Sequence, residues 1–323
     1  KVIELPNDGK TRRIGVIKLP TFYMDFAAAD AGSKDYRSTT RDVRRLLEQL
    51  QKDGIDGLVI DLRGNGGGSL REATELTGLF VRGGPVVQVR RHDGTVEVIQ
   101  DRDSSIVYSG PLVVLVDQFS ASASEIFAAA IQDYGRGVVV GQKTFGKGTV
   151  QTLIDLDRGL WSKEAGGRLK LTIAKFYRIN GHSTQQRGVE PDIVLPSAID
   201  ASRFYESAVE TALPWDEIRP VPFRPEGRLE PLLPLLRERH NKWAANNAAF
   251  QALIEEYAQL REIQNRQTLP LNEERRRQER IESEARQLSF VNRRLAAYGM
   301  KPVASLEELD EDALPDTILE SAA

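Results

Sequence analysis

Cysteine is absent from this 323-residue chain, and histidine and methionine are rare, with three and two copies. The lack of cysteine excludes disulfides, thiolate metal sites and a cysteine nucleophile, and it is compatible with oxidising and reducing compartments alike. No apolar run reaches the 18 residues that suggest a bilayer-spanning helix. Neither sign of charge dominates: 44 basic and 47 acidic residues give a net charge of -3, which favours no nucleic-acid partner.

The chain also lacks an initiator methionine, and its first residues, 1–4, do not form the basic and apolar regions of a signal peptide. It opens directly into a strand-like stretch, so we expect a mature form or a fragment of a longer protein. The length predicts about two domains, and an apolar content of 40% is enough for globular cores.

Short β-branched runs alternate with helical patterns between residues 10 and 200, which is typical of an α/β fold. Strands are predicted at 15–19, 58–62, 111–116, 138–140 and 149–154. Helices are predicted from Ser38 to Gly54, at 72–80 and at 122–134. The order strand, glycine or serine loop, helix therefore occurs twice.

The next stretch contains four prolines, at positions 214, 220, 222 and 225. Because proline lacks an amide donor, we predict neither a continuous helix nor a central strand there. We therefore predict an α/β core at 1–213 and an all-α domain at 214–323, with a Pro-rich linker at 214–231.

The predicted C-terminal domain carries one apolar helical stripe and a charged helix. The stripe consists of Trp243, Phe250, Ile254, Tyr257, Leu260 and Ile263. The next helix is predicted to begin at the N-cap Asn272. Its basic run 275–277 is interleaved with glutamates, which favours a solvated helix face with i,i+4 ion pairs over a nucleic-acid patch.

Three segments share one chemical logic: the glycine-rich strand exit 64–68, Ser122 at a helix start, and Lys147 between two glycines. A serine hydroxyl needs a base to take its proton, and a lysine can be that base when desolvation lowers its pKa. A helix start also offers backbone N–H groups to a developing oxyanion. Together the segments indicate a Ser–Lys nucleophilic site.

Each segment also has a purely structural interpretation. Ser122 and Glu125 match the S-x-x-E capping box, the glycine run is typical of a tight strand exit, and Lys147 would be an ordinary loop lysine. Residues 141–147 match a Walker A loop up to its lysine, but Gly148 stands where the magnesium-binding Ser or Thr is needed, and a strand follows instead of a helix.

Four segments in order carry a family resemblance: "LVIDLRGNGGGSLREATELTGLF", "VDQFSASASEIFAAAIQDYGR", "VVVGQKTFGKGTVQ" and "GVEPDIVLP". They resemble the C-terminal processing peptidases, the S41 family, and within it the tail-specific protease branch. The resemblance implies that Ser122 is the acylated nucleophile and Lys147 the general base. It also implies that Gln151 holds the lysine ammonium and that Gly68 and Ala123 supply the oxyanion amides.

The family has also been assigned a catalytic aspartate, which would be Asp133 here. On a continuous helix it would lie about 16 Å along the axis from Ser122, a distance that favours a role in ordering the helix end. A Ser-His-Asp triad through His182 is the alternative, although His92, His182 and His240 all fall outside the four segments.

The resemblance further implies a ClpP/crotonase-like ββα protease core, followed by the all-α domain. The implied activity is that of a serine endopeptidase without cofactor or metal, acting on protein substrates with apolar C-terminal tails. The implied location is the Gram-negative periplasm, soluble or peripherally membrane-associated, with an outer-membrane lipoprotein adaptor as partner. The family's PDZ domain and N-terminal segments have no counterpart in this chain. Two alternatives stay open: a catalytically silent scaffold or binding fragment, and a crotonase-type acyl-CoA enzyme.

Overall fold

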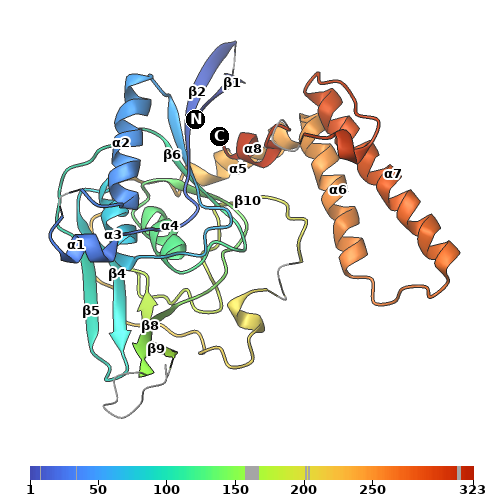
Figure 1. The fold of residues 1–323 in the computed structure, drawn as a ribbon. Helices are drawn as coiled ribbons and strands as arrows, with labels where there is room; N and C mark the ends of the chain where they lie inside the picture. The colour runs from blue at the N-terminus through green and yellow to red at the C-terminus, as the bar shows by residue number, and fades with distance from the viewer. Residues whose placement is uncertain (8, 34, 157–166, 201, 203, 311–313) are drawn as a thin grey trace.

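Two sheets and the helices between them form the first two hundred residues of this computed structural model (Figure 1). The structure describes residues 1–7, 9–33, 35–156, 167–200, 202, 204–310 and 314–323. Within them, the larger sheet has the strand order β1-β2-β3-β6-β7-β10, parallel except for the β1-β2 pair. Its strands are β1 Val2–Asn7, β2 Lys10–Lys18, β3 Gly57–Asp61, β6 Leu112–Val116, β7 Val138–Gly141 and β10 Ile193–Val194.

The smaller sheet is antiparallel in the order β5-β4-β9-β8, which leaves β8 at one edge of the described sheet. Its strands are β4 Gly84–Arg91, β5 Val96–Asp101, β8 Thr149–Asp155 and β9 Arg168–Tyr177. β8 follows Gly148 directly, as the sequence predicted, and this strand replaces the helix that a Walker A loop would require.

The strands of the larger sheet are apolar throughout because both faces of the sheet are covered. All five residues of β3 are buried; Leu58 and Ile60 pack into one core and Val59 into the other. Such continuous burial is typical of parallel strands. The α/β class predicted from the sequence is confirmed.

The helices on the face of the larger sheet that carries Leu58 and Ile60 belong to the α/β part of the chain. They are α1 Phe26–Asp30, α2 Thr39–Lys52, α3 Leu70–Gly78 and α4 Ala123–Asp133. Ser38 caps α2, accepting a hydrogen bond from the N–H of Arg41, which confirms the predicted helix. α3 begins two residues earlier than predicted because Ser69 caps it, with the N–H of Glu72 as donor.

The C-terminal region is helical, as predicted, and a hairpin of two of its helices projects from the body (Figure 1). Its helices are α5 Leu233–Asn246, α6 Ala248–Gln264, α7 Glu273–Ala297 and α8 Thr317–Ala322, and short 3₁₀ turns lie at η3 Glu206–Ala208 and η4 Leu306–Glu308. Asn272 caps α7, as predicted.

One prediction for this region was wrong. The apolar stripe does not run along a single helix, because Asn247 ends α5 and caps α6 by accepting from the N–H of Phe250. Ile263, at the far end of the stripe, is 48% exposed.

The C-terminal helices complete the second core of the larger sheet. Phe250 and Leu253 of α6 and Ile318 and Leu319 of α8 pack with Val59 and its neighbours. The Pro-rich stretch also contacts the α/β core: the indole N–H of Trp215 donates to the carbonyl of Ser183 (2.9 Å). The two predicted domains therefore share buried surface.

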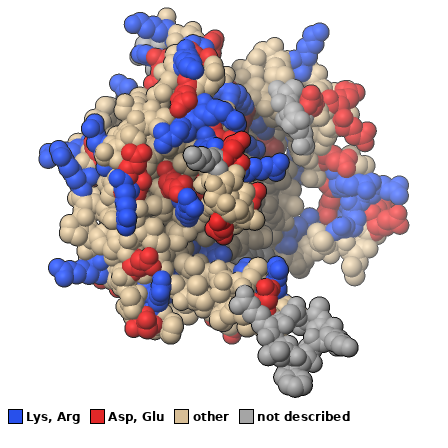
Figure 2. All heavy atoms as spheres, turned by 60° about the vertical axis from the view of Figure 1, so that its left-hand side comes forward, with Lys and Arg blue, Asp and Glu red and all other residues tan. Residues whose placement is uncertain are grey.

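Within the described residues, no helix is both long and apolar enough to cross a membrane. Basic and acidic side chains alternate over the face shown in Figure 2, without a region of one sign. This mixed surface agrees with the near-neutral composition.

Candidate active site

Ser122 occupies a backbone conformation that few side chains adopt. It links β6 to α4 with φ 57° and ψ -112°, and among the described non-glycine residues only Gln186 shares a positive φ. Such a conformation costs on the order of 1–3 kcal/mol and is retained only where the surrounding structure enforces it. A serine exposed on a strained strand-to-helix turn is the arrangement of a nucleophile elbow.

Glu125 holds this turn. Its carboxylate accepts the N–H of Ser122 (2.8 Å), as the S-x-x-E spacing predicted, and also the N–H groups of Gly146 (2.8 Å) and Lys147 (2.9 Å) and the hydroxyl of Thr144 (2.7 Å). Burial raises the pKa of Glu125 to about 7, although the four hydrogen bonds oppose that rise. One buried carboxylate thus joins the serine turn to the lysine loop.

The glycine loop packs directly against the serine turn. Asn65 connects the two: its side chain accepts the N–H of Gly67 (2.9 Å), and its carbonyl accepts the hydroxyl of Ser124 (2.8 Å). A Cβ atom on Gly67, which has φ +105°, would lie 2.8 Å from the carbonyl oxygen of Ala121 and 2.9 Å from Cβ of Ser122. The close approach therefore requires glycine.

The backbone N–H groups of Gly68 and Ala123 at this junction donate no hydrogen bond within the described part of the chain. Phe22 and Gly68 form a parallel β-bridge. The N–H of Phe22 donates to the carbonyl of Gly67 (2.9 Å), and the carbonyl of Phe22 accepts the N–H of Ser69 (2.8 Å). The N–H of Gly68 consequently points away from Phe22. Both amides are free to bind an anion, as the oxyanion assignment requires.

A cavity of about 350 Å³ lies between the serine turn and the β8-β9 hairpin. Its lining includes every residue of the predicted site except Asp133: Gly68, Ser122, Ala123, Lys147 and Gln151. Segments separated by more than eighty residues in the sequence therefore meet at one cavity.

Lys147 is half-buried in this cavity. Its pKa lies below the ordinary lysine value, first because burial disfavours the ammonium and then because Lys170 places a second positive charge nearby; Glu206 and Glu125 act in the opposite direction. Within the described residues, Lys147 Nζ makes no hydrogen bond to Ser122 Oγ or to the exposed side chain of Gln151.

Asp133 lies at the opposite end of α4 and does not line the cavity. It forms an ion pair with Arg178 (2.5 Å) and accepts a hydrogen bond from Asn180 (3.0 Å), so it fixes the end of the helix to the segment after β9. No histidine lines the cavity in the described structure, and His182 is exposed beside Trp215. The geometry gives no support to a triad through His182.

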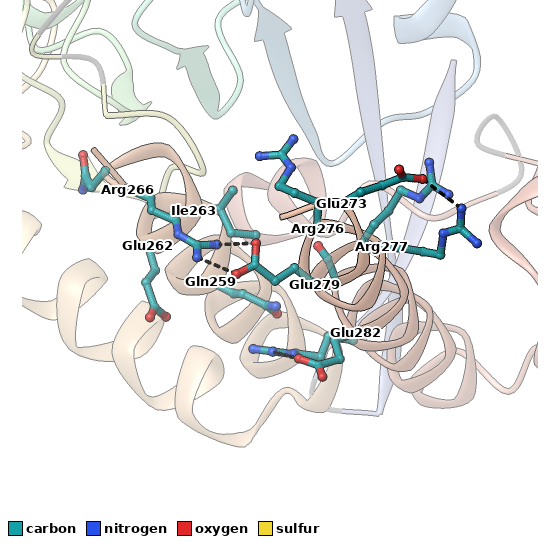
Figure 3. A pocket seen from close by; sticks show the side chains of 13 residues that line it. Gln259, Glu262, Ile263, Arg266, Glu273, Arg276, Arg277, Glu279 and Glu282 are labelled. Atoms are coloured by element: carbon teal, nitrogen blue, oxygen red, sulfur yellow. Dashed lines mark hydrogen bonds and ion pairs between the residues drawn. The ribbon is translucent and has the colours of Figure 1, made fainter. Parts of the chain in front are cut away.

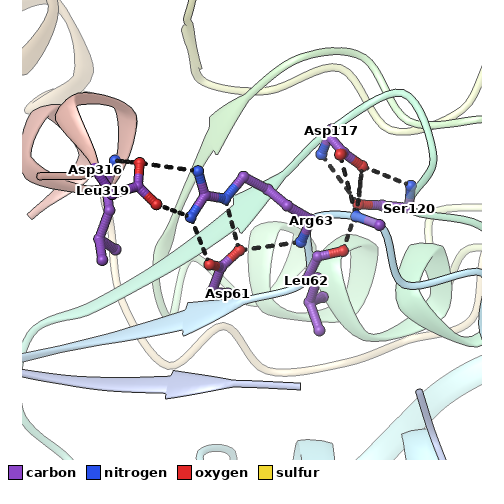
Figure 4. A network of polar contacts seen from close by, with 8 residues as sticks. Asp61, Leu62, Arg63, Asp117, Ser120, Asp316 and Leu319 are labelled. Atoms are coloured by element: carbon purple, nitrogen blue, oxygen red, sulfur yellow. Dashed lines mark hydrogen bonds and ion pairs between the residues drawn. The ribbon is translucent and has the colours of Figure 1, made fainter. Parts of the chain in front are cut away.

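The strand exit before the glycine loop is anchored on two sides (Figure 4). Arg63 pairs with Asp61 (2.7 Å) and with Asp316 (2.5 Å), the N-cap of α8. On the other side, Asp117 accepts the N–H of Gly64 (3.0 Å). The loop is therefore connected to the C-terminal helix as well as to the serine segment.

A larger hollow of about 1260 Å³ lies far from Ser122, between α6 and α7 (Figure 3). Its charges are largely paired: Arg266 with Glu279 (2.7 Å), and Arg277 with Glu273 (3.2 Å) at i,i+4 spacing. The predicted solvated, ion-paired face is confirmed for this helix. In the described ranges, no group of three or more acidic or histidine side chains could hold a metal ion.

Three functional contributors were not identified from the sequence: Asn65, Glu125 and Thr144. The spacing of Ser122 and Glu125 signals a helix cap, but nothing local shows that the same carboxylate also binds the lysine loop about twenty residues later. Asn65, between glycines, was grouped with the loop around it. Long-range contacts of this kind are not encoded in a local pattern.

Two family models divide the chain between them. Peptidase family S41 matches residues 13–195, and the C-terminal domain of tail specific protease matches residues 199–322. The tail-specific protease of Haemophilus influenzae is 40% identical over 321 residues, covering 96% of this chain and 44% of that protein. The chloroplastic C-terminal processing peptidase of Tetradesmus obliquus is 32% identical over 191 residues, covering 59% of this chain and 37% of that protein.

Among solved structures, a photosystem II D1 C-terminal processing protease is similar, with 31% identity and a TM-score of 0.48 over 59% of this chain and 44% of that chain. The chain spans less than half the length of these relatives.

Proposed function

The chain belongs to peptidase family S41 and carries the C-terminal domain of the tail-specific proteases, and from this membership we propose that it is the catalytic part of a serine endopeptidase with a Ser122–Lys147 dyad. Its substrates would be polypeptides with apolar C-terminal tails, processed or degraded in the periplasm. An outer-membrane lipoprotein adaptor and a PDZ domain elsewhere in the full-length protein would deliver them.

In the proposed reaction, neutral Lys147 takes the proton of Ser122 Oγ as that oxygen bonds to the scissile carbonyl carbon. The carbonyl electron pair moves to the oxygen, which accepts the N–H groups of Gly68 and Ala123. When the carbonyl re-forms, the C–N bond breaks and the leaving nitrogen takes the proton from Lys147. Water then attacks the acyl-enzyme, giving its proton to Lys147, and Ser122 regains a proton as its ester bond breaks.

The observation that carries the proposal is the strained Ser122 turn, which lies in one cavity with the free N–H groups of Gly68 and Ala123 and a half-buried amine of lowered pKa. If Ser122 only capped the helix, its strained backbone would be unnecessary, because a helix cap forms with ordinary extended backbone, as at Ser38.

Fluorophosphonate labelling and casein hydrolysis test the proposal. Ser122→Ala should abolish both, and Lys147→Ala and Lys147→Arg should each lower turnover by at least about a thousandfold, because a guanidinium does not act as a base. Lys143→Ala, a lysine four residues earlier that stacks on Tyr205, is the matched control and should retain activity. Full activity in Lys147→Arg would refute the base role.

A second candidate is a catalytically silent scaffold or binding fragment. It is favoured by one observation: no hydrogen bond joins Ser122 Oγ to Lys147 Nζ between these two described residues. Catalytic hydrogen bonds are often long before substrate binds, so the observation does not exclude the enzyme. Labelling decides, because a silent scaffold would leave Ser122 unmodified in correctly folded protein.

A further inference from the structure

The short 3₁₀ turn η3 lies against the loop that carries Lys147. We propose that Glu206, in this turn, is a positioning residue for the proposed reaction: it fixes the backbone on both sides of Lys147 and supplies a negative charge that stabilises the Lys147 ammonium. The inference rests on the proposed function. It adds a contribution from a segment that follows, in the sequence, the last described strand of either sheet.

Hydrogen bonds join Glu206 to the lysine loop at two points. Before Lys147, the N–H of Glu206 donates to the carbonyl of Phe145 (3.1 Å). After Lys147, the N–H of Gly148 donates to Oε1 of Gln185 (2.8 Å). Nε2 of Gln185 in turn donates to the carboxylate of Glu206 (3.1 Å). Glu206 thus holds the chain on both sides of the proposed base.

Gln185 is the connector between Glu206 and the lysine loop. Its side chain is completely buried (0% exposed), and both ends of its amide have partners. A Cβ atom on Gly148 would lie 2.7 Å from the backbone nitrogen of Gln185, so the two segments approach as closely as glycine allows. Because an unpaired buried amide is costly, the position of Gly148 depends on Gln185 and through it on Glu206.

Glu206 also affects the charge of the proposed base. Three charged groups act on Lys147: Lys170 of β9, Glu206 of η3 and Glu125 of α4. Burial and Lys170 lower the pKa of Lys147, whereas Glu206 and, to a smaller extent, Glu125 raise it. In the proposed reaction Lys147 becomes an ammonium when it takes the serine proton. A carboxylate in Glu206 stabilises that positive charge.

Glu206 is not placed to touch the substrate. Neither Glu206 nor Gln185 lines the cavity that contains Ser122. A change at Glu206 should therefore alter kcat and the pH dependence of the reaction and leave KM little changed. A residue that bound the peptide would change KM instead.

Two substitutions separate the charge of Glu206 from its position. Glu206→Gln keeps the length of the side chain and an oxygen that accepts from Gln185, but it removes the charge. The Lys147 ammonium then loses a stabilising neighbour, so kcat/KM should rise at a lower pH than in the unmodified protein. Glu206→Asp keeps the charge but is too short to reach Gln185, so kcat should fall about tenfold while the pH profile stays in place.

Glu210→Gln is the matched control. Glu210 is exposed and is not among the charges that act on Lys147, so this variant should keep both kcat and the pH profile. The rate of fluorophosphonate labelling of Ser122 as a function of pH is a second measurement, which does not depend on peptide binding. In Glu206→Gln it should show the same displacement to lower pH as kcat/KM.

Two results would each overturn the inference about Glu206. One is a labelling profile of Glu206→Gln that superimposes on that of the unmodified protein, and the other is an unchanged kcat in Glu206→Asp. In both cases labelling of Ser122 in the unmodified protein would still support the enzyme. Absence of labelling in the unmodified protein would overturn the proposed function and this inference together.

Discussion

At the scale of single residues, the protonation of Lys147 sets the pH range of the proposed reaction. Burial and the charge of Lys170 both lower its pKa below the ordinary lysine value of 10.5. The amine is neutral above its own pKa and only then accepts the serine proton. We therefore expect kcat/KM to rise with pH and to level off at a pH below that of an ordinary lysine side chain.

Lys170→Gln should move this pH profile to higher pH, because removing a neighbouring positive charge makes the Lys147 ammonium easier to form. Activity at neutral pH would fall accordingly. Lys170→Arg keeps the charge and should keep the profile. The measurement is the profile of kcat/KM from neutral to alkaline pH. Superimposable profiles for Lys170→Gln and the unmodified protein would contradict the electrostatic account.

At the scale of elements, Glu125 fixes the start of α4 to the loop that precedes β8. Glu125→Gln replaces one acceptor oxygen by a donor that faces other donors, and each buried group left unpaired costs about 1–3 kcal/mol. We expect a lower melting temperature and a kcat reduced by at least about a hundredfold, with a smaller change in KM, because the positions of Ser122 and Lys147 both depend on this carboxylate.

Glu72 offers a matched control for that variant. It is also fully buried near a helix start, where it accepts from the hydroxyl of Ser38 and from the N–H and hydroxyl of Thr40, but it does not line the cavity. Glu72→Ala removes the acceptor of these three hydrogen bonds, so it should lower the melting temperature and leave kcat per folded molecule nearly unchanged. If kcat fell to a similar extent in both variants, Glu125 would contribute to stability only and not to the positions of Ser122 and Lys147.

Elements were predictable from the sequence where local signals determine them. The helix start at Ser38, the cap at Asn272 and the strand after Gly148 depend on neighbouring residues, and all three predictions are confirmed. The helix break at Asn247 was missed because the apolar spacing continues across it. Asn65 and Glu125 were missed as connectors because their partners follow them by about 20 to 60 residues, and only the folded sheet brings these groups together.

At the scale of the whole molecule, the larger sheet is stabilised from both faces, and α8 contributes to the second core. The pair between Arg63 and Asp316 connects that helix to the strand exit that leads into the glycine loop (Figure 4). Burial alone would raise the pKa of Asp316, but Arg63 overrides it and holds the pKa below its usual 3.8. Its stabilisation is therefore present above about pH 4 and is lost as the pH falls through the lower, folded-state pKa.

Asp316→Ala should lower the free energy of unfolding by about 1–3 kcal/mol, because it removes a helix cap and a partly exposed ion pair. Asp316→Asn keeps a capping oxygen and removes the charge, so it should retain part of that stability. Denaturant unfolding at two salt concentrations measures both. If both variants unfold at the midpoint of the unmodified protein, α8 is not held through this pair.

Helix α4 is fixed to the β8-β9 hairpin at both of the helix's ends: Glu125 binds the segment just before β8, and Asp133 binds Arg178 just after β9. The hairpin is thus held at its base, and bending displaces the strands least where they are held. Thermal bending would displace the outer reaches of the strands, near Asp155 and Arg168, well before it altered the spacing of Ser122 and Lys147 at the base. The reacting groups would therefore keep their relative positions when the rest of the hairpin bends.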